Sequence, residues 1–254
     1  MLVNSLLFEN TNLLLIMTID TQSTLREIAD GIRSDVFKSY EALNLLHMIG
    51  ANASNINDSG FGIFFGRLQL ILQEQIILLL AKIFERPDEY PLKSIPAAEK
   101  FITENKLEFS QLESKDETVL MLLEKLGYKS SKKDDSVTEV FCKYWQNHIG
   151  ETKSIRQKIE ALRNKVSAHH EKVDDVSILP DISLLEITDL LERAKNFLAI
   201  IDSAYLNLVS VDYEGIYFAN TESKTASLIL KNLLVKAHII NIQKGRESAK
   251  NLYE

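Results

Sequence analysis

Apolar residues recur at three- and four-residue steps along most of this chain, and that spacing constrains its fold more than any other feature. The repeat runs through residues 21–49 and again through residues 183–208. Such spacing places apolar side chains on one face of an α-helix. Glycine and proline, which interrupt helices, number only 9 and 4 among 254 residues. The sequence therefore predicts an all-α fold of long helices.

The pattern divides the chain into three parts. Residues 1–17 are apolar, but they carry no lysine or arginine and fall short of the ~20 apolar residues that a membrane span needs. We expect them to be a dispensable or disordered extension. Residues 18–210 are predicted to form one helical domain, whose first helix is capped by Asp20 or Thr21. Residues 211–254 are predicted to form an arm, either a short hairpin or an extended segment, followed by a helix over residues 221–243.

An apolar stretch follows a polar break predicted at residues 52–60. From Leu68 to Leu80 the expected helix is apolar on nearly all sides. Arg67, Glu74 and several glutamines interrupt it. A buried central helix or a subunit interface fits this pattern better than a membrane span.

A third segment, from about residue 136 to residue 170, carries the side chains that could take part in catalysis. A helix is expected to start near Ser136 or Thr138, with Tyr144 and Trp145 in the core. After a break near Gly150 it is expected to continue to about Ala168.

Near the end of this helix stand Arg163, Asn164, His169 and His170. A guanidinium offers a planar fork of donors to phosphate oxygens, and an imidazole titrates near neutral pH. On a straight helix Arg163 lies about 120° from His169 and about 20° from His170, so geometry excludes neither histidine. These residues can cleave a phosphodiester, or they can be a salt-bridge partner and a solvated helix end.

Charge narrows the choice of nucleic-acid partner. The chain has a formal net charge of −7, whereas a general RNA-binding surface is basic. Residues 151–172 contain six basic side chains against three glutamates, a local charge of +3. This balance favours selective engagement of one RNA over indiscriminate binding. The candidate RNA-binding residues are Arg156, Lys158, Lys165 and Lys172.

Other chemistries find little support in the sequence. The single cysteine, Cys142, excludes an internal disulfide and indicates a reducing, cytoplasmic location. There is no glycine-rich phosphate loop and no His-Glu-x-x-His helix. His169 and His170 could join Asp174 or Asp175 around a metal, but adjacent helical residues point about 100° apart. We therefore predict neither a metal site nor a cofactor.

The string from Arg163 and Asn164 to His169 resembles the signature of the HEPN superfamily. Together with residues 61–100 and Pro180, it is similar to the abortive-infection AbiU-like branch, over residues 21–208. The resemblance implies an up-and-down helical bundle, here with an extra carboxy-terminal helix, that cleaves RNA without metal as a homodimer. It gives His169 the role of general acid or base and Arg163 that of the phosphorane-stabilising cation. Asn164 orients the substrate or the arginine, and His170 is a second proton carrier or a surface residue.

The resemblance further implies antiviral defence or a toxin controlled by a partner protein. Some HEPN toxins are silenced by modification of a tyrosine two residues after the histidine, where this chain has Glu171 or Lys172. An antitoxin would therefore act differently here. The alternative from another class is a non-catalytic helical module that binds nucleotide, RNA or a protein.

Overall fold

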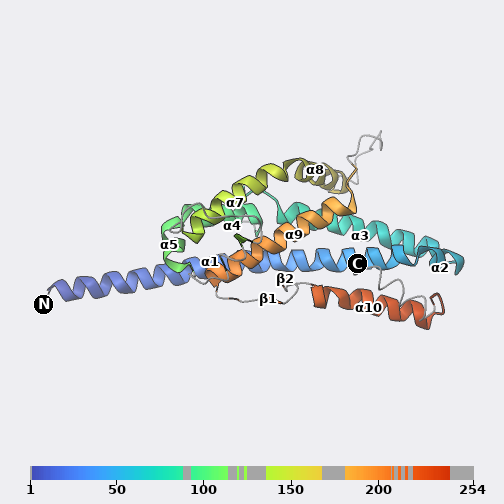
Figure 1. Ribbon diagram of the computed structural model, residues 1–254, viewed down its shortest axis with the longest axis horizontal. Coiled ribbons are helices and arrows are strands. Elements are labelled where there is room, and N and C mark those ends of the chain that lie inside the picture. The colour runs from blue at the N-terminus through green and yellow to red at the C-terminus, as the bar shows by residue number, and fades with distance from the viewer. Residues whose placement is uncertain are drawn as a thin grey trace. The chain divides into compact units, whose positions relative to one another are not determined.

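The computed structural model describes residues 2–87, 93–113, 119, 123–124, 136–167, 181–206, 208, 211–212, 215–216 and 220–240. Over these residues the fold is all-α, as the apolar spacing predicts, apart from two strands of two residues each (Figure 1). The elements are α1 (Leu2–Ala51), α2 (Ala53–Asp58), α3 (Gly62–Ile83), α4 (Ile95–Glu104), α5 (Lys106–Leu112), α7 (Val137–Glu151), α8 (Lys153–Ser167), α9 (Leu184–Ile201), the π-helical turn η2 (Asp202–Leu206), β1 (Val211–Asp212), β2 (Gly215–Ile216) and α10 (Asn220–Lys236).

Helix α1 begins well before the expected cap at Asp20 or Thr21, so that prediction is wrong. No proline precedes Pro87, so nothing in the covalent chain forces the helix to start later. Thr21 lies inside α1, and its hydroxyl donates a hydrogen bond to the Glu108 carboxylate on α5. Whether residues 1–17 can be removed stays a prediction.

Close contacts divide the chain into two compact units. Unit 1 comprises Met1–Ser34, Lys82–Lys158 and Ile182–Tyr217, and unit 2 comprises Asp35–Ala81, Ile159–Asp181 and Phe218–Glu254. Both α1 and α8 contribute residues to each unit. These two units are defined by contacts in the structure, whereas the domains predicted over residues 18–210 and 211–254 are defined by sequence pattern. The contacts do not test whether the predicted domains fold independently, so that division stays a prediction.

Aromatic side chains form the core of unit 1. Tyr205 of η2 lies 5.0 Å from Phe109 of α5, and Phe197 of α9 lies 4.7 Å from Trp145 of α7, between ring centroids. Trp145 is 2% exposed and Tyr144 3%, which confirms both as core residues. Because rings from four elements interlock here, this core fixes α7 against α9.

Helix α9 has the start that its sequence encodes. The Ser183 side chain accepts from the backbone N–H of Glu186, and the Glu186 carboxylate accepts from the backbone N–H of Ser183. This reciprocal capping box satisfies two backbone donors. At the other end of the helix the carbonyls of Tyr205 and Leu206 in η2 accept hydrogen bonds from side chains of α1. The helix is therefore anchored at both ends.

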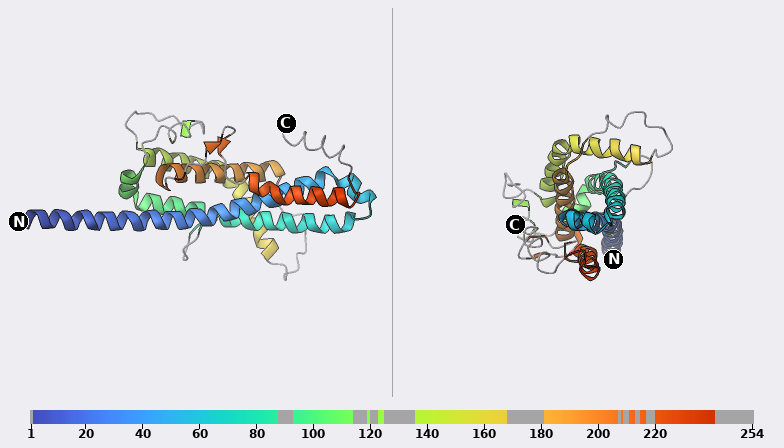
Figure 2. Two further views of the ribbon diagram at one scale, coloured as in Figure 1. Left: turned by 90° about the horizontal axis from the view of Figure 1, so that it is seen from below. Right: turned by 90° about the vertical axis from the view of Figure 1, so that its right-hand side faces the viewer.

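Unit 2 contains α2, α10, most of α3 and the carboxy-terminal parts of α1 and α8. The polar stretch predicted as a break contains α2, and Gly60, with φ of 81°, supplies the left-handed turn that leads into α3. Phe65, Leu72 and Ile76 of α3 are buried. Figures 1 and 2 show α10 alongside the carboxy-terminal part of α1. The break is thus a short helix within a helical hairpin.

The predicted arm contains a minimal hairpin. Val211 of β1 pairs antiparallel with Ile216 of β2, and Asp212 pairs with Gly215. The following helix, α10, was predicted over residues 221–243 and is observed over Asn220–Lys236.

One helix of the described residues, α3, is long and apolar enough to cross a membrane by length and composition alone. A helix buried in a protein core passes the same test, so this finding is weak.

Candidate functional site at the end of α8

Helix α8 carries the first two residues of the predicted motif. It is described as far as Ser167, and the end predicted at Ala168 lies outside the described residues. Arg163 is half-buried and Asn164 is exposed. The predicted site residues His169, His170 and Lys172 lie outside the described residues, and of Lys165 only the helical backbone is described. The convergence of a histidine on Arg163 therefore stays a prediction.

Arg163 and Asn164 are joined through their side chains. The Asn164 amide oxygen accepts from Nε of Arg163 at 3.3 Å and from Nη2 at 3.2 Å. Two donors of one planar group on a single acceptor restrict the orientation of the guanidinium. An oriented guanidinium can receive phosphate oxygens with a smaller entropic cost.

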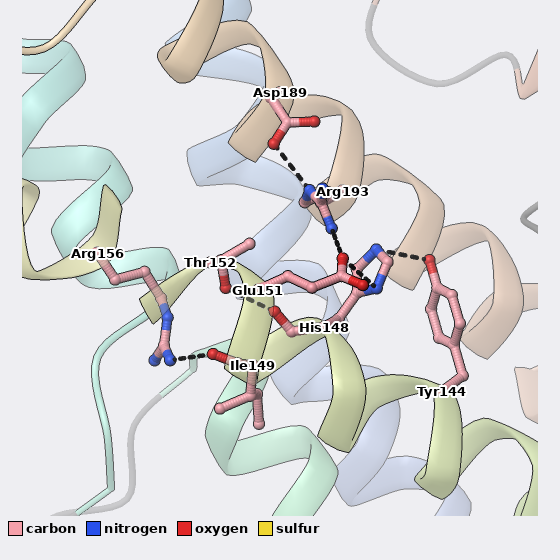
Figure 3. Close-up of polar contacts among 8 residues, drawn as sticks. All are labelled: Tyr144, His148, Ile149, Glu151, Thr152, Arg156, Asp189 and Arg193. Atoms are coloured by element: carbon pink, nitrogen blue, oxygen red, sulfur yellow. Dashed lines mark hydrogen bonds and ion pairs between the residues drawn. The ribbon is translucent and has the colours of Figure 1, made fainter. Parts of the chain in front are cut away.

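Arg156, predicted to contact RNA, makes a contact within the protein, and its contact with RNA stays a prediction. Its Nη2 donates to the carbonyl oxygen of Ile149 at 2.8 Å, in the last turn of α7. The Thr152 hydroxyl donates to the neighbouring His148 carbonyl, also at 2.8 Å (Figure 3). The His148 carbonyl also accepts from the backbone N–H of Thr152 at 3.0 Å. Carbonyls in the last turn of a helix often lack intrahelical donors, and these side chains supply donors there. The turn between α7 and α8 is thereby stabilised.

Lys158, also predicted to contact RNA, joins α8 to α9. Its Nζ lies 2.6 Å from Oε1 of Glu186, the same carboxylate that closes the capping box. The Lys158 hydrogen bond, followed by the bonds from Ser183, lowers the pKa of Glu186 to about 2. Glu186 is therefore ionised at neutral pH and stays ionised until the pH falls toward about 2.

A polar cluster between α7 and α9 was not predicted as a unit (Figure 3). His148 has its Nε2 3.0 Å from the Tyr144 hydroxyl and its Nδ1 3.7 Å from the Glu151 carboxylate. Arg193 donates to Glu151 at 3.0 Å and to Asp189 at 2.8 Å. The signals in the sequence were the four-residue spacings of Tyr144 with His148 and of Asp189 with Arg193.

The histidine of this cluster is poorly suited to proton transfer with a substrate. Burial lowers the pKa of His148, and the Arg193 guanidinium lowers it further, against the opposing effects of Glu151 and Asp189. Its imidazole is therefore mainly neutral near pH 7. Both ring nitrogens already face protein groups. The cluster joins α7 to α9, and we assign it a structural role.

A second carboxylate of unit 1 shows how burial reverses the effect of a cation. Asp202 of η2 accepts from Nη2 of Arg33 at 2.7 Å. Its side chain is 2% exposed, and burial raises its pKa in spite of the arginine. Glu186, at a similar distance from Lys158, has a lowered pKa because it is less buried and accepts additional hydrogen bonds.

The described part of the chain contains no group of three or more His, Cys, Asp or Glu side chains that could hold a metal ion. Cys142 lies 3.8 Å from the Thr103 hydroxyl, and burial raises the pKa of its thiol. A thiol with a raised pKa is a poor nucleophile at neutral pH. The alternative ligand set of His169, His170, Asp174 and Asp175 lies outside the described residues.

Comparison of the chain with protein-family models, with curated protein sequences and with solved structures gives no match. The fold and the geometry of the site define the protein only as an all-α protein in which Asn164 orients Arg163 near the end of α8.

Proposed function

We propose that the protein is a metal-independent endoribonuclease of the HEPN type. The observation that carries the proposal is the pair of hydrogen bonds from the Arg163 guanidinium to Asn164. A positioned arginine just before two histidines in the sequence is what cleavage by the RNA's own 2′-hydroxyl requires.

In this mechanism RNA supplies the nucleophile. His169 accepts the proton of the 2′-hydroxyl, whose oxygen then attacks the adjacent phosphorus. Arg163 stabilises the added negative charge of the phosphorane, and Asn164 holds the guanidinium toward it. The 5′-oxygen leaves with a proton from a second imidazole, and the product ends in a 2′,3′-cyclic phosphate. The second imidazole belongs to His170 or to the partner's His169 in a homodimer.

The RNA-binding surface of this proposal is narrower than the sequence suggested. Arg156 and Lys158 contact α7 and α9. Lys165 and Lys172 then supply the phosphate contacts beside Arg163. Few neutralised phosphates mean weak non-specific affinity, as expected for a chain of net charge −7. Such an enzyme suits a cytoplasmic role in antiviral abortive infection, or as a toxin restrained by a partner protein.

The test is incubation of the purified full chain with total RNA and tRNA in excess EDTA. Wild-type protein is expected to cleave, and Arg163→Ala and His169→Ala are expected to lose cleavage. Lys153→Ala serves as the matched control, because Lys153 is an exposed cation on the same helix. Product ends are identified by their resistance to ligation until the cyclic phosphate is opened and the resulting phosphate is removed. Cleavage that persists in Arg163→Ala, or in both His169→Ala and His170→Ala, would contradict the proposal.

A non-catalytic module is the second candidate, and one observation favours it. Two of the four residues predicted to contact RNA, Arg156 and Lys158, already make contacts within the protein. Such a module binds nucleotide, RNA or protein without turnover. Stable binding of RNA in a filter assay, with the RNA recovered intact, would favour it over the ribonuclease.

A further inference from the structure

Helix α3 leaves one apolar stripe exposed. Core residues such as Phe65, Leu72 and Ile76 lie on the opposite side of the helix. At about 100° per residue, the stripe residues fall within an arc of about 100°. Arg67 and Glu74 lie near the middle of this arc, about 20° apart. The apolar members are Ile63 at 79% exposed, Leu70 at 60%, Ile71 at 59% and Leu78 at 41%.

The order of residues in the stripe is symmetric about its centre. The midpoint lies between Leu70 and Ile71. Arg67 stands as far before that midpoint as Glu74 stands after it, and Ile63 as far before it as Leu78 after it. Each apolar residue thus mirrors an apolar residue, and the cation mirrors an anion. A surface that is complementary to itself after reversal is what a two-fold interface requires.

Two copies of α3 packed antiparallel satisfy this symmetry. A two-fold axis between Leu70 and Ile71 brings each of these residues against its own counterpart. The same axis sets Arg67 level with the partner's Glu74, and it sets Ile63 level with the partner's Leu78. The two ion pairs are equivalent by symmetry and flank an apolar centre, the usual arrangement of a stable interface.

We infer that α3 is the contact between two copies of this chain, packed antiparallel about a two-fold axis between Leu70 and Ile71.

A lipid bilayer suits the stripe less well than a second copy. Arg67 and Glu74 occupy its middle, and hydrocarbon would strip water from both charged side chains at a large cost in free energy. In the antiparallel pair each charge meets its opposite. The proposed ribonuclease also works as two copies, but the α3 contact is argued from its own residues and does not depend on RNA cleavage.

The first experiment measures the mass of the full chain by sedimentation velocity over a range of concentrations. Wild-type protein is expected to be a dimer. Leu70→Asp places two carboxylates against each other at the axis, and we expect the dimer to weaken on the order of 100-fold. Leu107→Asp is the matched control, because Leu107 is 83% exposed and belongs to α5, not to the stripe. Circular dichroism verifies that each variant is folded. A monomeric wild-type protein overturns the inference, as does a dimer that Leu70→Asp leaves intact.

Charge reversal tests the ion pairs. Arg67→Glu and Glu74→Arg each bring like charges together, and each is expected to weaken the dimer about tenfold. The double variant R67E/E74R restores opposite charges across the axis and is expected to recover the wild-type dimer. A double variant weaker than both single variants overturns the antiparallel arrangement.

Cysteine cross-linking fixes the direction of packing. In a Cys142→Ser background, Leu70→Cys lies against its counterpart and is expected to form an intermolecular disulfide. Ile63→Cys lies about 22 Å along the axis from its counterpart, too far for one. Cross-linking of both variants indicates parallel packing and overturns the proposed axis. Co-flotation of wild-type protein with phosphatidylcholine and phosphatidylglycerol vesicles would make the bilayer the occupant and likewise overturn it.

Discussion

The two halves of α8 use their cations differently. At the amino-terminal half, Arg156 donates to a carbonyl of α7, and Lys158 pairs with Glu186 beside α9. Near the carboxy-terminal end, the Arg163 guanidinium donates to Asn164, its neighbour in the same helix. All three are basic residues of one amphipathic helix, and sequence spacing alone does not separate them.

The difference teaches that a positive helix is not by itself a nucleic-acid surface. A cation that joins two helices is held by the fold, and moving it toward a phosphate breaks a structural contact. The Arg163 guanidinium, by contrast, is oriented by the residue that follows it in the same helix. We therefore place the proposed chemistry at Arg163 and the structural role at Arg156 and Lys158, and the following variants test that division.

The largest effect is expected for Arg163→Ala. Loss of the phosphorane-stabilising cation should reduce the rate of RNA cleavage on the order of 100- to 1,000-fold, as removal of one transition-state donor does in other enzymes. Lys158→Ala, in the other half of α8, should cleave at nearly the wild-type rate per folded molecule. Single-turnover cleavage of one labelled RNA measures both rates. Equal losses in the two variants would remove the distinction between the halves.

Asn164→Ala should have a smaller effect on the same reaction. Without the amide oxygen the guanidinium samples more orientations, so we expect kcat to fall about tenfold while KM changes little. Because Asn164 acts through Arg163, the double variant should be no slower than Arg163→Ala alone. A double variant that is slower still would show that Asn164 contacts the RNA directly.

Arg156→Ala should lower stability and leave cleavage per folded molecule unchanged. The Ile149 carbonyl loses a charged hydrogen-bond donor, and we expect the free energy of unfolding to fall by about 1 kcal/mol. Urea denaturation followed by circular dichroism measures the change, with Lys153→Ala as the exposed control on the same helix. If stability is unchanged and cleavage falls, Arg156 belongs to the RNA-binding surface after all.

The smallest effect is expected at the pair of Lys158 and Glu186, and it depends on pH. Folding lowers the pKa of Glu186 from 4.5 to about 2, so the folded state favours the ionised form. The resulting stabilisation is complete above pH 4.5 and is lost as pH falls toward about 2. Glu186→Gln should therefore be less stable than wild-type protein at pH 6, and the gap should close on acidification. A gap that stays constant down to pH 2 would refute an ionic contribution.

Much of the fold could be predicted because local patterns encode it. The helices that became α7 and α9 begin at serines that cap them, and their apolar faces form the core of unit 1. Three features were missed for identifiable reasons. The start of α1 was placed too late, because a polar residue that is able to cap a helix can also lie inside one, as Asp20 and Thr21 do. The short helices α2 and α5 are too brief for a periodic pattern to emerge.

The candidate site could be predicted only in part. The adjacency of Arg163 and Asn164 is visible in the sequence, and their hydrogen bonds follow from it. The contact between Lys158 and Glu186 joins residues 28 positions apart, and the cluster around His148 and Arg193 joins α7 to α9. Spacing within one helix cannot report such pairs.

The sequence by itself determined that the chain is helical and where most of its helices lie, because helix formation and capping depend on neighbours within a few positions. Only the tertiary structure decided which charged side chains form contacts between helices and which apolar faces stay exposed. Burial and ion pairing depend on what another helix brings to the same point in space. For this reason the apolar face of α9 is buried beyond its first turn, whereas α3, which is also mostly apolar, keeps an exposed apolar stripe.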